Sequence, residues 1–134
     1  MKGRCACGSV QIELKRRPES VNQCDCSACL HVGAAWGYFH PAEVAITGET
    51  ARFVRSDMPE PSIAFHFCAN CGSTTHWSSI LAEPRARTGI NMRLFEPDEL
   101  EGLEVHFSDG LRRQGSSRPP ERHAPITIKN RWPT

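Results

Sequence analysis

Residues 68–72 read Cys-Ala-Asn-Cys-Gly, and near the N-terminus residues 5–8 read Cys-Ala-Cys-Gly. The first stretch is typical of a tight metal-binding turn, in which Gly72 supplies a permissive backbone just after the second thiol. In the second stretch the two cysteines lie two residues apart, so an extended strand would direct both side chains to one face. The sequence therefore predicts a closed, tetrahedral structural Zn²⁺ site that ties the N-terminal strand to a segment some sixty residues later. Its four thiolate ligands would be Cys5, Cys7, Cys68 and Cys71.

A third cluster, Cys-Asp-Cys-Ser-Ala-Cys at residues 24–29, supplies three more thiols. Three protein ligands match the pattern of catalytic zinc, in which the fourth position is left for water or substrate. Three thiolates bring the overall charge of the site to about −1, which weakens the metal as a Lewis acid for activating water. Coordination nevertheless deprotonates an incoming thiol, which is otherwise only a few per cent ionised at neutral pH. We therefore predict Cys24, Cys26 and Cys29 as catalytic residues that hold a second, labile zinc.

Other divisions of the seven cysteines stay open at this point. The two C-x2-C pairs would suit an ordinary zinc ribbon. That ribbon would contain Cys26, Cys29, Cys68 and Cys71 and leave out Cys5, Cys7 and Cys24. Alternatively, a histidine could close the middle cluster into a second structural site, with His31, His66 and His76 as the nearest candidates. A single histidine is more often a surface or packing residue, so no histidine is assigned to a metal. The last alternative is that the cysteines are buried thiols that bind no metal.

The composition indicates one intracellular domain. The chain has 134 residues, 39% of them hydrophobic, which suits a single modest core. Its formal net charge of +1 gives no reason to expect nucleic acid or an anionic membrane as a partner. The N-terminus shows no apolar signal region and no apolar stretch reaches membrane length, so we expect a cytoplasmic protein. In that reducing compartment an odd number of thiols indicates metal binding or catalysis rather than disulfides.

Short segments separated by Gly and Pro indicate a mainly β fold. Apolar and polar residues alternate in a strand-like way, or form short apolar runs bounded by turns, at 10–14, 44–46, 51–53, 63–67, 89–94 and 105–107. Helix is predicted only for a turn or two, over 27–32 and after Pro97. Residues 1–109 are expected to form the zinc-binding domain, and residues 110–134, which are polar and Arg-rich, an irregular tail that packs on it. The apolar residues that would dock this tail are Ile126, Ile128 and Trp132.

The cysteine motifs occur in a distinctive order: C-x-C-G, then C-x-C-x2-C some twenty residues later, then F-C-x2-C-G. This order, together with Gly-Ile-Asn-Met-Arg-Leu-Phe at 89–95 and the stretch 105–110, resembles the glutathione-dependent formaldehyde-activating enzyme family, which includes centromere protein V. The resemblance covers about residues 3–109. It implies an Mss4-like, zinc-stapled β fold, to which the chain would add one or two short helices. It also implies the division of the cysteines into four structural and three catalytic zinc ligands.

The family's reaction condenses glutathione with formaldehyde to S-hydroxymethylglutathione and is classed with the carbon–sulfur lyases. The resemblance implies that the glutathione thiol occupies the open position beside the middle cluster and attacks the aldehyde carbon. Because glutathione carries two carboxylates, its site should offer cations, for which the sequence provides Arg4, Arg52, Arg55, Arg85, Arg87 and Arg93. The alternative is a non-catalytic zinc scaffold that acts as a protein-binding module or as a thiol or metal carrier. The sequence does not indicate an oligomeric state.

Overall fold

The computed structural model describes residues 1–82, 86–117 and 123–133, and these residues are mostly β with two short helices. The strands are β1 (Lys2–Arg4), β2 (Gln11–Leu14), β3 (Val21–Cys24), β4 (Trp36–Phe39), β5 (Val44–Thr47), β6 (Thr50–Val54), β7 (Ile63–Cys68), β8 (Thr74–Ser79), β9 (Thr88–Asn91), β10 (Glu104–Ser108) and β11 (Ile126–Thr127). The helices are α1 (Ser27–Val32) and α2 (Gly110–Arg113), and the 3-10 turns are η1 (Pro41–Glu43), η2 (Met92–Leu94) and η3 (Pro97–Leu100). The predicted fold class is therefore confirmed.

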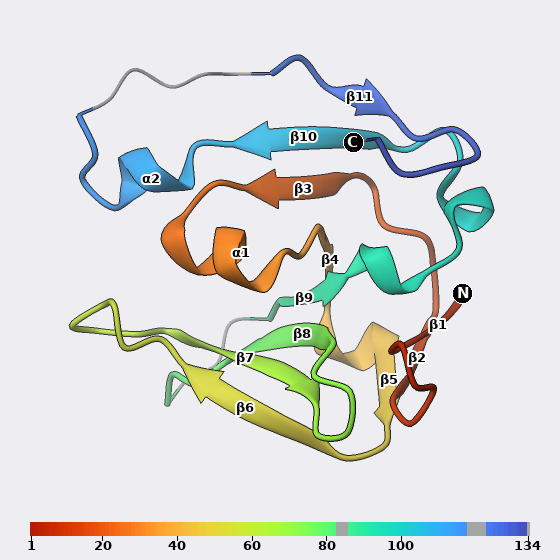
Figure 1. Cartoon of the computed structure of the whole chain (residues 1–134), viewed down its shortest axis with the longest axis horizontal. Helices are drawn as coiled ribbons and strands as arrows, with labels where there is room; N and C mark the ends of the chain where they lie inside the picture. Colours follow the sequence, from red (N-terminus) through yellow and green to blue (C-terminus); the bar gives the residue numbers. More distant parts are fainter. Residues whose placement is uncertain (83–85, 118–122, 134) are drawn as a thin grey trace.

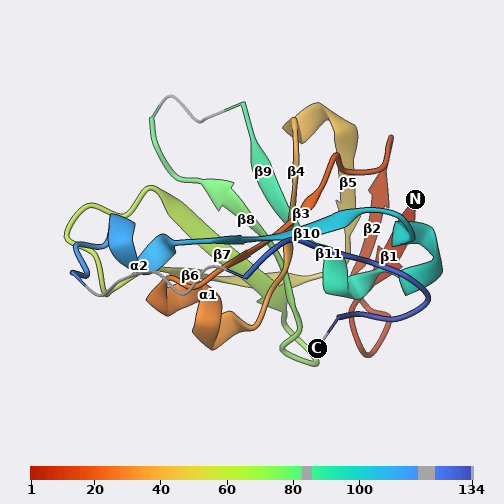
Figure 2. The same ribbon diagram turned by 90° about the horizontal axis from the view of Figure 1, so that it is seen from above.

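The strands form two sheets that lie side by side (Figure 1). The small sheet has the order β1-β2-β5, and the large one the order β11-β10-β3-β4-β9-β8-β7-β6. Within the described part of the chain, β3 and β10 form a parallel pair, with Cys24 opposite Ser108, and the other pairs are antiparallel. Because parallel strands end at the same edge of a sheet, α1 and α2, which follow these two strands, begin next to each other. Both views place the two helices at one end of the molecule and the small sheet at the other (Figures 1 and 2).

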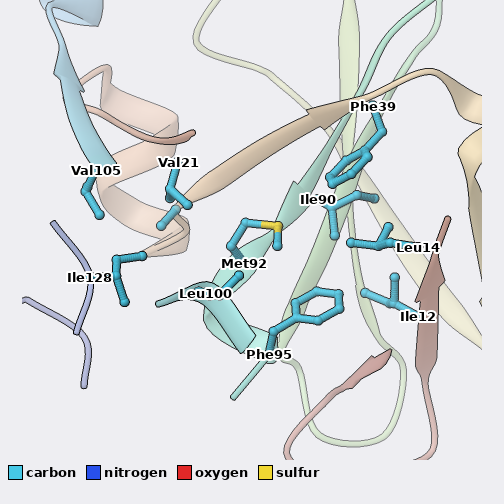
Figure 3. Packing of buried hydrophobic residues seen from close by; sticks show 11 residues of the cluster. Ile12, Leu14, Val21, Phe39, Ile90, Met92, Phe95, Leu100, Val105 and Ile128 are labelled. Atoms are coloured by element: carbon cyan, nitrogen blue, oxygen red, sulfur yellow. The ribbon is translucent and has the colours of Figure 1, made fainter. Parts of the chain in front are cut away.

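The main core lies between the small sheet and the neighbouring part of the large one (Figure 3). Its buried side chains are Ile12, Leu14, Val21, Ala35, Phe39, Ile90, Met92, Phe95, Leu100, Val105 and Ile128. A second cluster gathers Trp36, Phe65 and Trp77 around two of the middle cysteines, and a third packs Val10 against Cys5 and Cys68. Four of the thiols are therefore buried in apolar packing, namely Cys5, Cys26, Cys29 and Cys68, whereas Cys7 and Cys71 are exposed.

The secondary structure agrees with the sequence prediction at several positions. The helix expected over 27–32 is α1, and the turn expected after Pro97 is the 3-10 turn η3. The alternation at 51–53 does not bury its apolar side chains, since Phe53 on β6 is 46% exposed. No helix of the described residues is long and apolar enough to cross a membrane.

The segment after residue 109 is more regular than its composition indicates. It contains α2 and β11, which pairs antiparallel with β10. Ile128 is fully buried in the main core and Trp132 packs against that core, whereas Ile126 is 43% exposed. Burying Ile128 removes an aliphatic side chain from water, which stabilises the folded chain by about 2 kcal/mol.

Candidate functional site

The sulfurs of Cys5, Cys7, Cys68 and Cys71 all lie within 4.8 Å of one another. The Sγ atom of Cys7 is 3.6 Å from that of Cys5 and 3.7 Å from that of Cys68. A tetrahedral Zn²⁺ with Zn–S bonds of about 2.3 Å requires sulfurs about 3.8 Å apart, so the donor set and its spacing fit zinc. The structure thus brings together four residues that could hold a metal ion.

Two similar turns position these four thiols. The Gly72 amide donates to the carbonyl of Cys68 at 2.9 Å, and Gly72 has a left-handed φ of +77°, as expected of a metal-binding turn. At the N-terminus the Gly8 amide donates to the carbonyl of Cys5 at 3.0 Å, with a φ of +78° at Gly8. The expectation that an extended strand presents the first two cysteines is therefore wrong. They lie in the turn between β1 and β2, because the left-handed glycine closes the chain back on itself before a strand can continue.

Hydroxyl groups of the same turns stabilise the thiolate form of the two exposed thiols. Hydrogen bonding with the Ser9 hydroxyl, 3.1 Å from the Cys7 sulfur, and with Asn70 lowers the pKa of Cys7 to about 5. The Ser73 hydroxyl, 3.2 Å from the Cys71 sulfur, is the largest cause that lowers the pKa of Cys71 to about 7. Metals bind thiolates, and these turns stabilise the thiolates without a metal. The turns therefore favour the binding of a cation.

The three middle cysteines form a second, separate group within 4.8 Å of one another. Cys24 ends β3, Cys26 is the N-cap of α1, and Cys29 lies one turn further along the helix. The amide of Cys26 donates to the Cys24 sulfur and the amide of Cys29 to the Cys26 sulfur, both at 3.4 Å. A helix N-terminus explains this spacing, since its first amides have no partner within the helix.

One of these thiols is favoured as the thiolate. A hydrogen bond from Cys26, followed by one from Cys29, lowers the pKa of Cys24. The thiolate at Cys24 and the burial of the site raise the pKa of Cys29, whose sulfur accepts a hydrogen bond from the Trp36 indole N–H at 3.4 Å. The group therefore carries negative charge in a half-buried position, which a bound cation would neutralise.

The structure does not bring the alternative groupings together among its described residues. The sulfurs of Cys26 and Cys29 lie with that of Cys24. They do not lie with those of Cys68 and Cys71, as a zinc ribbon would require. No described histidine joins the three-thiol group. His31 is exposed and its ring contacts the carbonyl of Ser27 at 2.6 Å. The rings of His66 and His76 instead stack on each other on β7 and β8 with their centroids 4.1 Å apart.

A cavity of about 220 Å³ opens beside the three middle thiols. Aromatic and apolar side chains form much of its wall, namely Trp36, Tyr38, Ile63, Phe65 and Trp77. Three arginines also line it, namely Arg55, Arg87 and Arg113. Two of these were among the sequence candidates. Arg113 was missed, because the sequence does not show which residues of the C-terminal segment approach the cysteines.

The other candidate arginines do not line this cavity. Arg4 lies on β1, Arg52 on β6 opposite His66, and Arg93 stacks over the Trp132 ring, 5.3 Å from its centroid. Arg85 lies outside the described residues.

Residues 1–103 match the family described as glutathione-dependent formaldehyde-activating enzyme. Among solved structures, the chain is similar to the crystal structure of a Rhodobacter sphaeroides protein determined as a structural genomics target. The TM-score is 0.61 and the identity 24%, over 81% of this chain and all of the other, a likeness that shows the fold alone. No match was found among curated proteins. Since the family match spans most of the chain and includes all seven cysteines, the protein belongs to the glutathione-dependent formaldehyde-activating enzyme family.

Proposed function

We propose that the protein is a zinc-dependent carbon–sulfur lyase-type enzyme that condenses glutathione with formaldehyde to S-hydroxymethylglutathione. The observation that carries the proposal is the three-thiol group of Cys24, Cys26 and Cys29, which shares one cavity with aromatic side chains and cations. A cavity of about 220 Å³ accepts a small part of a substrate, such as a cysteinyl side chain and a one-carbon aldehyde, with the rest of the peptide at its mouth. The family supplies the identity of the two substrates.

In this proposal the two thiol groups have different roles. Cys5, Cys7, Cys68 and Cys71 hold a structural zinc, because four thiolates complete the tetrahedron and tie two distant turns together. Cys24, Cys26 and Cys29 hold a catalytic zinc, which when bound supplies a position where the substrate thiol loses its proton. These roles, and the cytoplasmic location expected from the sequence, are part of the proposal.

The reaction is an addition without a net redox change. A bond forms between the glutathione sulfur and the formaldehyde carbon, and the carbon–oxygen π bond breaks. The proton that leaves the thiol ends on the new hydroxyl oxygen, so the product contains all atoms of both substrates. The protein must therefore stabilise negative charge first on sulfur and then on oxygen.

Tyr38 suits the second of these tasks. Its side chain lines the cavity, and burial raises the pKa of its hydroxyl, so the group keeps its proton at neutral pH. The hydroxyl oxygen accepts a hydrogen bond from the Asn22 amide at 2.7 Å, which leaves its own O–H free to donate into the cavity. We assign to Tyr38 the donation of a hydrogen bond to the aldehyde oxygen as charge develops there.

The experiment compares the zinc-loaded wild type with Cys26→Ser. Because thiols add to formaldehyde without a catalyst, the rate is measured by exchange NMR above the background without protein. The wild type should accelerate formation of S-hydroxymethylglutathione, whereas Cys26→Ser should reach only the background while it keeps its fold by circular dichroism and one zinc per chain. A zinc-loaded wild type at the background rate would refute the proposed activity and leave a scaffold or carrier role.

A further inference from the structure

The short helix α2 lies after the family-matched residues 1–103 and yet forms part of the site. The parallel pairing of β3 with β10 brings the end of β10 beside Cys24, and both views show α2 next to α1 (Figures 1 and 2). Gly110, the first residue of α2, packs directly on the middle cluster. A Cβ atom there would overlap the Cys24 sulfur and lie 2.7 Å from the Cys26 amide nitrogen. The first residue of α2 therefore lies in direct contact with the middle cysteines.

Hydrogen bonds that join Asp25 and Ser27 to residues of α2 and to the following Gln114 hold the helix beside the middle cysteines. The Asp25 carboxylate accepts from the amides of Gly110 at 2.6 Å and Leu111 at 3.1 Å. The Gln114 side chain accepts from the Ser27 amide and donates to the Ser27 hydroxyl, both at 3.0 Å. Asp25 and Ser27, which lie between the cysteines, thus position α2.

This placement brings one cation of α2 to the mouth of the cavity. The Arg113 Nη2 atom lies 3.5 Å from the Cys24 sulfur, and the side chain is exposed. Arg87, just before β9, lies over the Tyr38 ring with its guanidinium 4.5 Å from the ring centroid, and it is also exposed. Arg113 and Arg87 thus face one cavity from two separate parts of the chain.

The third arginine of the cavity is already engaged. Arg55 forms two hydrogen bonds to the Asp57 carboxylate, at 3.0 Å and 2.8 Å, and a third to the Ser27 hydroxyl at 3.3 Å. Its charge is therefore neutralised within the wall. By contrast, no carboxylate of the described residues forms an ion pair with Arg87 or Arg113.

We propose that Arg87 and Arg113 bind the carboxylates of the thiol substrate and so select an anionic thiol over a neutral one. The inference rests on the proposed function only for the identity of that thiol as glutathione, whose two carboxylates flank its central cysteine. The specificity of the site is then completed by the C-terminal segment, because Arg113 comes from α2. Guanidinium groups suit this role, since they bind carboxylates through paired, charge-assisted hydrogen bonds.

The test measures binding of glutathione and of glutathione diethyl ester, in which both carboxylates are esterified. Trp36 and Trp77 line the cavity, so their fluorescence reports occupancy without requiring turnover. We expect the zinc-loaded wild type to bind glutathione at least tenfold more tightly than the ester. Arg113→Gln and Arg87→Gln should each weaken glutathione binding about tenfold and leave ester binding unchanged.

Two further variants separate recognition from loss of charge. Arg112→Gln removes the same charge from the neighbouring position of α2, which does not line the cavity, and should bind glutathione as the wild type does. Arg113→Lys should recover part of the lost affinity, because it keeps the charge without the planar fork.

The outcomes of this test distinguish the inference from the proposed function. Equal affinity of the wild type for glutathione and its ester would overturn the inference, even if the enzyme turns over formaldehyde. Equal losses in Arg112→Gln and Arg113→Gln would overturn it as well. Discrimination between the two ligands without turnover would support an anionic-thiol site and refute the lyase activity.

Discussion

Acid should destabilise the protein through His76, and replacing this histidine should remove that sensitivity. His76 on β8 stacks against His66 on β7, and its ring contacts the Thr75 hydroxyl at 2.9 Å. The cations nearby are Arg52, opposite His66 on β6, and Arg87, which lines the same hollow as His76. No carboxylate belongs to the described lining of that hollow. Burial, with a smaller contribution from His66, lowers the pKa of His76 to about 3.

The sign of the effect follows from the direction of this shift. In the unfolded chain a histidine has a pKa of about 6.5, so below that pH the unfolded state binds a proton that the folded state does not. The contribution of His76 to stability is therefore complete above pH 7 and is lost progressively as the pH falls toward 3. For a folded pKa of about 3, the loss between pH 7.5 and pH 5.0 is about 2 kcal/mol.

Urea unfolding at constant free zinc and at both pH values measures this loss. Acid also protonates thiolates, so the informative quantity is the difference between the wild type and His76→Gln, which shares that background. The variant should lose about 2 kcal/mol less than the wild type over this interval. His106→Gln, which removes an exposed imidazole 3.2 Å from the Glu104 carboxylate on β10, should lose no less than the wild type. Equal losses in the wild type and His76→Gln would show that His76 is not held neutral by the fold.

Three further predictions concern the zinc sites, the cavity and the C-terminal segment. If Cys5, Cys7, Cys68 and Cys71 hold the proposed structural zinc, Cys71→Ser should remove one zinc per chain by metal analysis and unfold the domain, because such a zinc contributes on the order of 10 kcal/mol against a total stability of similar size. Tyr38→Phe should lower kcat about 100-fold with little change in KM for glutathione in steady-state assays, since it removes a donor used only as charge develops. An unchanged kcat would rule out that role. Ile128→Ala should lower the free energy of unfolding by about 3 kcal/mol, whereas Ile126→Ala, at a partly exposed position, should change it by less than about 1 kcal/mol in the same urea titrations.

The sequence contained much of the information on the fold, but unevenly. It predicted a helix of a turn or two over 27–32, where the structure has α1. It also predicted β2, because apolar and polar residues alternate there. It did not reveal β4, whose residues Trp36–Phe39 are largely buried on both faces and therefore show no alternation. It also did not reveal β8, which is mostly polar and is held by its pairing with β7 and β9. Both strands depend on neighbours that are distant in the sequence.

The candidate site divides in a similar way. Ligand counting and spacing grouped the cysteines as the structure places them, because both depend on local geometry within short motifs. The predicted strand conformation at Cys5 and Cys7 was wrong. A spacing of two residues suits both a strand and a tight turn, and only the left-handed conformation of Gly8 distinguishes the turn from the strand. The cavity's cations could not be ranked, because whether an arginine lines it depends on how sheets and helices pack.

The position of α2 shows why local motifs leave part of such a site undetermined. Cys24 and Ser108 are opposite each other only because β3 and β10 pair in parallel across more than eighty residues of chain. Once that register is fixed, Asp25 can cap the amides of Gly110 and Leu111, and Arg113 reaches the Cys24 sulfur. A one-residue change of register would turn the side chains of β10 to the other face of the sheet and would shift α2, and with it Arg113, relative to the thiols. The cysteine motifs thus specify the groups of thiols, whereas the long-range strand pairing determines which charges surround the middle group.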